Sequence, residues 1–345
     1  MNDVLIRITG VVGRITLNRP AALNALTHDM VRAIDAALID WAPRDDIAML
    51  VIDATGDKAF CAGGDIQQMY ATGRAGDYAY GRRFWRDEYR MNARLCNFPK
   101  PVVSFLQGYT MGGGVGVGCH ASHRITGHTS CIAMPECGIG LVPDVGGSLI
   151  LARAPGRLGE YLAITAARMD AADAIHAGFA DYFIAEDDWP ALIASLETSG
   201  DWTRIDAAAQ DQGNSSLAQQ SAETDDFFSA ESLLHLHNAL DHSTDDFAHG
   251  ALSALERVSP LSAACSLELI RRVRGLDTIE HALGMEYRFT YRAMEHGDFL
   301  EGIRAAIIDK DRTPHWRHGL RDAGAHFAAM LRPLGDEALD LGGST

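Results

Sequence analysis

Two glycine turns in this sequence have residue types and spacing that could do chemistry. The turns at residues 60–65 and 111–114 each follow an apolar, strand-like run and precede a helical pattern. The N-terminus of a helix leaves backbone N–H groups without partners and carries partial positive charge. Two such ends could converge on one oxygen that becomes negative during a reaction, and glycine leaves room for the substrate there. The alternative is that these glycines only permit tight turns and close helix packing.

Two carboxylates follow the second turn. Pro135 suits the first position of a helix, which would place Glu136 at a helix start, and Asp144 lies eight residues later. Beside an oxyanion hole, one carboxylate can attack a carbonyl or deprotonate water while the other orients the water. The alternatives are that Asp144 caps a helix over residues 145–153 and that Glu136 only complements a helix dipole. We interpret Cys137 as a packing residue, because nothing in the sequence suggests a lowered thiol pKa.

Other chemistries lack their motifs. The sequence contains no GxxxxGK[ST] phosphate loop, no GxGxxG dinucleotide fingerprint, no GxSxG nucleophile elbow and no HExxH zinc helix. His235 and His237 are two residues apart, so on a helix they would point to different sides. We therefore predict no metal site.

Composition narrows the class of protein. The chain has 345 residues, 47% of them hydrophobic, and a formal net charge of −16, which argues against nucleic acid or an anionic membrane as a partner. Eleven of the 34 glycines lie between Gly108 and Gly147, among apolar residues. The six cysteines form no CxxC pair, and the N-terminal residues do not resemble a leader peptide. We therefore predict a cytoplasmic protein.

A strand–turn–helix rhythm must position the chemical groups, and it predicts an α/β fold. Apolar runs predict strands at residues 4–8, 14–17, 49–53, 102–106 and 130–134. Helical spacing predicts helices at residues 233–240, 247–258, 260–274 and 278–295. We predict an α/β core over residues 1–195, a linker or exposed loop over 196–228, and a helical subdomain over 229–345.

The opening residues 15–26 and the two glycine turns together resemble the enoyl-CoA hydratase/isomerase (crotonase) superfamily. The resemblance implies the ClpP/crotonase fold, a spiral of ββα units, here with a helical C-terminal subdomain. It implies that the N–H groups of Gly64 and Gly113 form an oxyanion hole for a thioester carbonyl. It also implies substrate contacts at Gly63, Asp65 and Gly112.

A narrower resemblance depends on Gly116. Hydratases of the superfamily carry a catalytic glutamate at this place, two residues after the three glycines, where this chain has glycine. Residues 111–116, 133–147, 285–288 and 297–316 instead resemble the 3-hydroxyisobutyryl-CoA hydrolase branch. Glu88 then matches a glutamate that contacts the substrate. The sequence departs from the pattern at Ala21, where a basic residue is common and is usually a CoA contact.

The resemblance implies an acyl-CoA thioester hydrolase that acts on a short 3-hydroxyacyl-CoA, first of all 3-hydroxyisobutyryl-CoA, as in valine breakdown. Glu136 would attack the thioester or activate a water, Asp144 would orient the water or Glu136, and Glu88 would bind the 3-hydroxyl. No cofactor is needed, because CoA enters with the substrate. A homo-oligomer is compatible with the superfamily. The alternatives are an enoyl-CoA hydratase or isomerase, and a catalytically silent acyl-CoA-binding protein, which retention of the three carboxylates disfavours.

Overall fold

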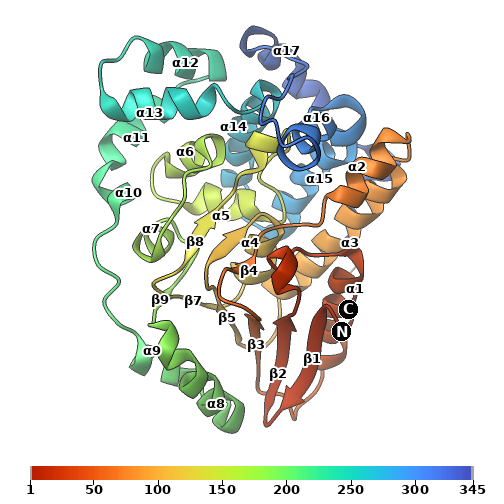
Figure 1. Ribbon diagram of the computed structural model, residues 1–345, viewed down its shortest axis with the longest axis vertical. Helices are drawn as coiled ribbons and strands as arrows, with labels where there is room; N and C mark the ends of the chain where they lie inside the picture. Colours follow the sequence, from red (N-terminus) through yellow and green to blue (C-terminus); the bar gives the residue numbers. More distant parts are fainter. Residues whose placement is uncertain (1, 343–345) are drawn as a thin grey trace. The chain divides into compact units, whose positions relative to one another are not determined.

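A computed structural model describes residues 2–342, which form two compact units with interleaved segments (Figure 1). Unit 1 comprises the residues up to Gly64 together with Asp87–Ala133 and Arg168–Ala218. Unit 2 comprises Asp65–Arg86, Met134–Ala167 and the residues from Gln219 onward. These units differ from the predicted contiguous segments, because the chain leaves the strand-rich unit after Gly64, Ala133 and Ala218 and returns to it twice.

Unit 1 is built on a six-stranded sheet in the order β1-β2-β3-β5-β7-β9. The strands are β1 (Val4–Thr9), β2 (Val12–Leu17), β3 (Met49–Ala54), β5 (Val102–Phe105), β7 (His123–Thr126) and β9 (Tyr182–Phe183). Only the β1–β2 hairpin is antiparallel among these described pairs. The apolar run of β3 is buried because its neighbours on both sides are parallel strands whose faces are covered. The prediction of strands at 49–53 and 102–106 is confirmed.

A second, three-stranded parallel sheet precedes three of the predicted site segments. Its strands are β4 (Ala59–Cys61), β6 (Tyr109–Met111) and β8 (Cys131–Ala133), in that order. Parallel strands have their carboxyl ends at the same edge of a sheet, where α/β proteins commonly bind ligands. Each of the three strands leads directly into one of the predicted site segments. β4 leads to Gly63 and Gly64, β6 leads to Gly112 and Gly113, and β8 leads to Pro135 and Glu136.

The other helices of unit 1 are α1 (His28–Trp41), α4 (Gly113–Gly118), α7 (Ala171–His176), α8 (Trp189–Ser199) and α9 (Thr203–Ala208). Helix α3 (Ala79–Cys96) begins in unit 2 and ends in unit 1. Thr27 caps α1 by accepting a hydrogen bond from the Met30 N–H. One apolar cluster packs β3, β5 and β7 against α8.

Unit 2 is mostly helical. Its helices are α2 (Gln67–Arg74), α5 (Gly147–Arg153), α6 (Leu158–Thr165), α11 (Ser221–Phe228), α12 (Leu233–Asp241), α13 (Asp246–Leu255), α14 (Pro260–Arg274), α15 (Ile279–His296), α16 (Phe299–Ile303) and α17 (Leu320–Met330). The four helices predicted after residue 230 are confirmed as α12 to α15. Ser259 and Thr278 cap α14 and α15 through their side-chain oxygens.

The segment 196–228 differs from the linker that its polar composition predicted. It contains the end of α8, α9, α10 (Ser216–Gln219) and α11, with an extended stretch near residues 209–215. Asp173 holds the start of α10 by accepting hydrogen bonds from Ser215, Ser216 and the Leu217 N–H. No described helix is both long enough and apolar enough to cross a membrane.

Candidate active site

The first glycine turn is held by the loop that precedes α1. The Leu26 N–H donates to the Gly63 carbonyl at 2.9 Å, and Leu26 and Gly64 form an isolated parallel bridge. The Ala62 N–H donates to the Leu23 carbonyl at 3.0 Å. Gly63 has a φ of +114°, which favours glycine. Gly64 lies three residues before α2, so its amide is positioned by the bridge to Leu26, and the prediction that a helix N-terminus presents it is wrong.

Asn24 explains why the loop before α1 is ordered. Its side chain is buried, and Nδ2 donates to the carbonyls of Thr55 at 3.0 Å and Ala59 at 2.9 Å. The Arg19 N–H donates to Asn24 Oδ1 at 2.8 Å. These bonds satisfy buried backbone carbonyls beside β4. The opening motif therefore serves to fix the first glycine turn.

The second glycine turn lies at the start of α4. Gly112 is the N-cap with a φ of +51°, and Gly113 is the first helical residue. A Cβ atom on Gly114 would lie 2.2 Å from the Cys61 carbonyl oxygen, so the backbone of α4 approaches β4 as closely as glycine allows. Here the prediction of an amide at a helix N-terminus is confirmed.

The two turns meet at Gly113. A Cβ atom on Gly113 would lie 3.3 Å from the Gly64 nitrogen and 3.2 Å from Leu26 Cδ1. A Cβ atom on Gly63 would lie 4.0 Å from the Gly113 nitrogen. The amides of Gly64 and Gly113 are therefore close neighbours in unit 1. Two neighbouring backbone donors are the arrangement that stabilises a developing oxyanion.

Glu88 joins this arrangement from α3. Its side chain is 3% exposed, and Oε1 lies 3.0 Å from the position of a Cβ on Gly113. Burial raises the pKa of the Cys61 thiol to about 12, and the charge of Glu88 contributes to that rise. Cys61 is therefore a protonated thiol at neutral pH, and it is not suited to act as a nucleophile. Sequence reasoning found Glu88 through the family resemblance alone.

In unit 2, Glu136 is the first residue of a 3₁₀ turn, Glu136–Ile139, with Pro135 as its N-cap. The prediction placed Pro135 one position later, inside the helix. The Glu136 side chain is 4% exposed. Gly140 has a φ of +73°, and a Cβ there would lie 2.5 Å from the Asp298 carbonyl carbon. A Cβ on Gly302 would lie 2.1 Å from the Ile139 carbonyl oxygen, so the turn packs backbone to backbone against α16.

Cys137 behaves as a packing residue, as interpreted from the sequence. Burial raises the pKa of its thiol to about 12, and its Sγ lies 3.2 Å from Ser266 Oγ. It belongs to the apolar cluster that joins α6 to α12, α13 and α14.

Asp144 does not cap a helix. The helix that follows it, α5, begins at Gly147, and its N-cap is Gly146, which has no side chain that could bond the first turn. Glu286 of α15 takes this role: it accepts hydrogen bonds from the Gly146 N–H at 2.8 Å and the Ser148 N–H at 3.1 Å. The Asp144 side chain is 4% exposed. The capping alternative for Asp144 is therefore wrong.

Glu286 is the residue of this region that sequence reasoning missed. It lies in the motif at residues 285–288, but no local pattern connects it with residues 146–148. The structure brings together Gly63, Gly64, Gly113 and Glu88 in unit 1, with Gly112 adjacent to Gly113 in the chain. It places Glu136, Asp144 and Asp65 in unit 2, where Asp65 is half-buried.

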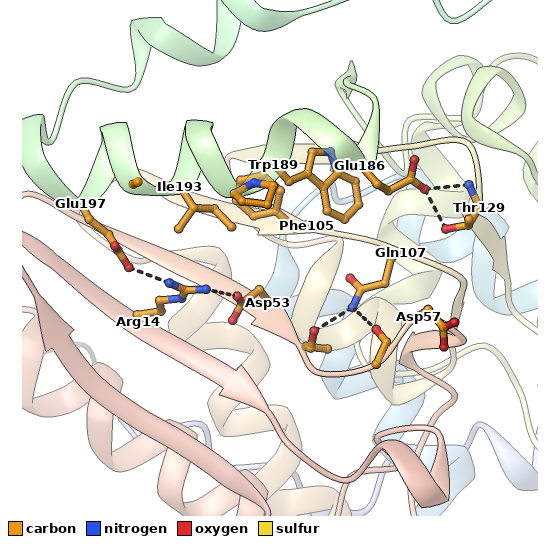
Figure 2. A pocket seen from close by; sticks show the side chains of 14 residues that line it. Arg14, Asp53, Asp57, Phe105, Gln107, Thr129, Glu186, Trp189, Ile193 and Glu197 are labelled. Carbon is orange, nitrogen blue, oxygen red and sulfur yellow. Dashed lines mark hydrogen bonds and ion pairs between the residues drawn. The ribbon is translucent and has the colours of Figure 1, made fainter.

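A cavity of about 590 Å³ lies elsewhere in unit 1, between α8 and the strand ends (Figure 2). Phe105 and Trp189 form its apolar wall, and Arg14 bridges two carboxylates at one end. Its carboxylates are Asp53, Asp57, Glu186 and Glu197. None of the predicted site residues lines it, and four carboxylates beside one guanidinium do not suit the negatively charged phosphates of an acyl-CoA.

Among residues 2–342, no three His, Cys, Asp or Glu side chains are arranged to hold a metal ion. The prediction of a reaction without cofactor stays a prediction.

The chain resembles curated proteins over nearly its whole length. The family model described as enoyl-CoA hydratase/isomerase matches residues 12–324. The mitochondrial 3-hydroxyisobutyryl-CoA hydrolase of Gallus gallus is 35% identical, with 98% of this chain and 91% of that protein covered. The protein of the same name from Homo sapiens is 36% identical, with 91% of this chain and 84% of that protein covered.

Solved structures confirm the predicted α/β crotonase-like fold. An enoyl-CoA hydratase from Rhodobacter sphaeroides 2.4.1 is 55% identical with a TM-score of 0.95, covering 98% of this chain and 100% of that chain. A carnitinyl-CoA dehydratase from Mycobacterium thermoresistibile is 38% identical with a TM-score of 0.94, covering 100% of both chains.

The prediction of a cytoplasmic location is contradicted by these comparisons, because the curated relatives are named as mitochondrial proteins. Neither observation behind the prediction, the cysteine pattern or the N-terminal residues, was sufficient. Cysteines without a CxxC pair do not distinguish the cytoplasm from another reducing compartment, and the first residues of a sequence are a weak guide to location.

The glycine turns, the three buried carboxylates and the full-length similarity agree. The chain belongs to the enoyl-CoA hydratase/isomerase (crotonase) superfamily and, within it, to the 3-hydroxyisobutyryl-CoA hydrolase branch.

Proposed function

We propose that this protein hydrolyses a short 3-hydroxyacyl-CoA thioester, first of all 3-hydroxyisobutyryl-CoA, to the free 3-hydroxy acid and CoA. The amides of Gly64 and Gly113 bind the thioester oxygen. Glu88 binds the 3-hydroxyl of the acyl group. Glu136 and Asp144 supply and orient the group that attacks the carbonyl carbon.

The observation that carries this proposal is the place of Glu88. Its Oε1 lies beside the Gly113 backbone, next to both oxyanion donors. A carboxylate there repels the negative charge that develops on the thioester oxygen, at short range and in a site of low dielectric constant. A substrate hydroxyl that donates to Glu88 offsets this repulsion, and a carboxylate can accept several such bonds. An acyl group without the hydroxyl lacks this stabilisation, so the site favours 3-hydroxyacyl groups.

Glu136 can act by either of two routes. In the first, its carboxylate oxygen bonds to the carbonyl carbon, the C–S bond breaks, CoA leaves as the thiolate and takes up a proton, and water hydrolyses the resulting anhydride. In the second, Glu136 accepts a proton from a water that attacks the carbonyl carbon directly, the C–S bond breaks, and the CoA thiolate leaves and takes up that proton. Asp144 orients the water or Glu136 in both routes.

An enoyl-CoA hydratase is the alternative, and the similar structure from Rhodobacter sphaeroides is described as an enoyl-CoA hydratase. Hydration of an enoyl group in this superfamily uses a second glutamate, two residues after the three glycines. This chain has Gly116 there, buried in α4. Without that carboxylate no group is assigned to share the proton transfers of hydration, so hydrolysis is preferred.

We propose that the reaction needs no metal or redox cofactor, because CoA enters and leaves with the substrate. We place the reaction in valine breakdown, by the names of the curated relatives. The supporting finding for an acyl-CoA substrate is family membership. Assembly into a homo-oligomer remains a prediction.

Glu88→Gln should reduce selectivity for the hydroxyl group. We expect kcat/KM for 3-hydroxyisobutyryl-CoA to fall about 10- to 100-fold, the value of a hydrogen bond to a charged group, while kcat/KM for isobutyryl-CoA stays unchanged or rises. Release of free thiol from both substrates measures the ratio of kcat/KM for 3-hydroxyisobutyryl-CoA to kcat/KM for isobutyryl-CoA. Asp87→Asn is the matched control: it lies on the same helix, contacts His28 at 2.7 Å and should leave the ratio unchanged. If this kcat/KM ratio is the same in Glu88→Gln as in the wild type, Glu88 does not bind the 3-hydroxyl group.

A further inference from the structure

Glu286 is a fully buried carboxyl group on α15 whose bonds all go to the start of α5. Its two oxygens accept from the N–H groups of Gly146 and Ser148, and Ser148 Oγ donates to the same oxygen as the Ser148 N–H. Partners separated by 138 to 140 residues make this a tertiary contact, which fixes one short backbone segment against a helix of the C-terminal region.

The segment that Glu286 holds is strained. Val145 lies between Asp144 and Gly146 and has a φ of +54°, a conformation that is a rare outlier for a β-branched residue. Such a conformation persists only where the surrounding structure holds it, and it occurs most often at functional sites. The Gly147 N–H donates to the Asp144 carbonyl at 2.7 Å and closes the turn on one side. The bonds to Glu286 begin at the residue directly after Val145.

We propose that Glu286 is a positioning residue for hydrolysis, which holds the strained Asp144–Val145–Gly146 turn and thereby sets the orientation of Asp144. This inference rests on the proposed role of Asp144 in the reaction. Glu286 acts through the backbone of residues 146 and 148, and it is assigned no contact with the substrate.

Both oxygens of Glu286 must accept from backbone N–H groups, and a carboxyl group can do so in either protonation state, because its proton can point to Ser148 Oγ. A glutamine would turn its NH₂ group toward one of the two N–H donors, so at least one bond would be lost whichever way the amide points. Burial raises the pKa of Glu286 to about 8 against the opposing effect of the Ser148 and Gly146 bonds, and the negative charge of Asp144 contributes to that rise.

A double-mutant cycle between Glu286→Gln and Asp144→Asn tests the proposal, with steady-state thiol release from 3-hydroxyisobutyryl-CoA as the readout. In the wild-type background we expect Glu286→Gln to lower kcat about tenfold or more, as a misplaced catalytic group does, with KM changed by less than about twofold. In the Asp144→Asn background the same change should alter kcat by less than about twofold, because the orientation it disturbs no longer matters.

Two outcomes contradict the account, and they differ. If Asp144→Asn keeps the wild-type kcat, the proposed role of Asp144 fails, and this inference fails with it. If Asp144→Asn lowers kcat but Glu286→Gln lowers it by the same factor in both backgrounds, only the positioning role is overturned.

Ser148→Ala keeps the proposal testable if Glu286→Gln does not fold. It removes the hydroxyl donor and leaves both N–H bonds in place, so we expect kcat to fall about two- to fivefold. That loss should also disappear in the Asp144→Asn background. A loss that persists there in full overturns the proposal.

Discussion

Glu136→Gln is expected to lower kcat for 3-hydroxyisobutyryl-CoA about 1,000-fold while the protein stays folded. A glutamine amide can neither accept the proton of an attacking water nor form an anhydride with the acyl group, so both routes are closed. The glutamine has nearly the same shape as the glutamate, so we expect the variant to fold. Thiol release measures kcat, and thermal unfolding followed by circular dichroism measures the fold.

Glu160→Gln is the matched control for this prediction. Glu160 is also a fully buried carboxyl of unit 2, but it accepts hydrogen bonds from Arg274 at 2.8 and 2.9 Å and from Arg157 at 3.0 Å. Removing one partner of a buried ion pair is destabilising, so Tm should fall while kcat at 25 °C stays near the wild-type value. If Glu136→Gln keeps more than about a tenth of the wild-type kcat, Glu136 is not the catalytic carboxylate.

Gly113→Ala keeps the backbone N–H but places a methyl group where the acyl oxygen must lie, so we expect kcat to fall about 100- to 1,000-fold, as when an oxyanion donor no longer reaches its oxygen. The added methyl would lie 3.0 Å from Glu88 Oε1 and 3.3 Å from the Gly64 nitrogen, in the space assigned to the acyl oxygen. Gly113 does not have a positive φ, so alanine fits its backbone conformation. The methyl would also lie 3.2 Å from Leu26 Cδ1, so its buried neighbours must shift slightly; we expect a moderate fall in Tm and a much larger loss of kcat, measured by thiol release at 25 °C.

Alanine substitutions at two other glycines distinguish a loss of catalysis from a loss of stability. Gly114→Ala would place its methyl 2.2 Å from the Cys61 carbonyl oxygen, so we expect this variant to be strongly destabilised. Gly250 is an interior residue of α13 with no atom within 4 Å of an added Cβ, so Gly250→Ala should keep the wild-type kcat and raise Tm slightly. Wild-type kcat in Gly113→Ala would show that the Gly113 amide does not bind the reacting oxygen.

Local patterns in the sequence predicted much of the fold. The helix at 260–274 is confirmed with both of its ends, because Ser259 and Pro260 mark its start and Gly275 follows its last residue. β3 is confirmed to within one residue, since its buried apolar run is unbroken. The three-stranded sheet was only partly predicted. Strand β8 is also short but was predicted at residues 130–134, whereas the three-residue strands β4 and β6 directly adjoin the glycine turns and show no separate apolar run.

The candidate site could be predicted where its residues adjoin glycine turns, and it could not where distant residues determine the geometry. A strand followed by glycines suggested the backbone donors. The bridge between Leu26 and Gly64 depends on a loop almost forty residues away, so the sequence suggested a helix N-terminus in its place. Asp144 before a helical pattern suggested a cap, but the first turn of α5 is bonded by Glu286, from the other end of the chain. Contacts at such separations leave no local pattern in one sequence.

The central claim is that this site hydrolyses a hydroxylated acyl thioester and does not hydrate an enoyl group. The direct measurement incubates the wild-type protein separately with 3-hydroxyisobutyryl-CoA and with crotonyl-CoA, and follows both free thiol and enoyl absorbance. We predict rapid thiol release from 3-hydroxyisobutyryl-CoA and no loss of enoyl absorbance from crotonyl-CoA. Loss of enoyl absorbance without thiol release from either substrate would contradict the account and would identify a hydratase in spite of Gly116.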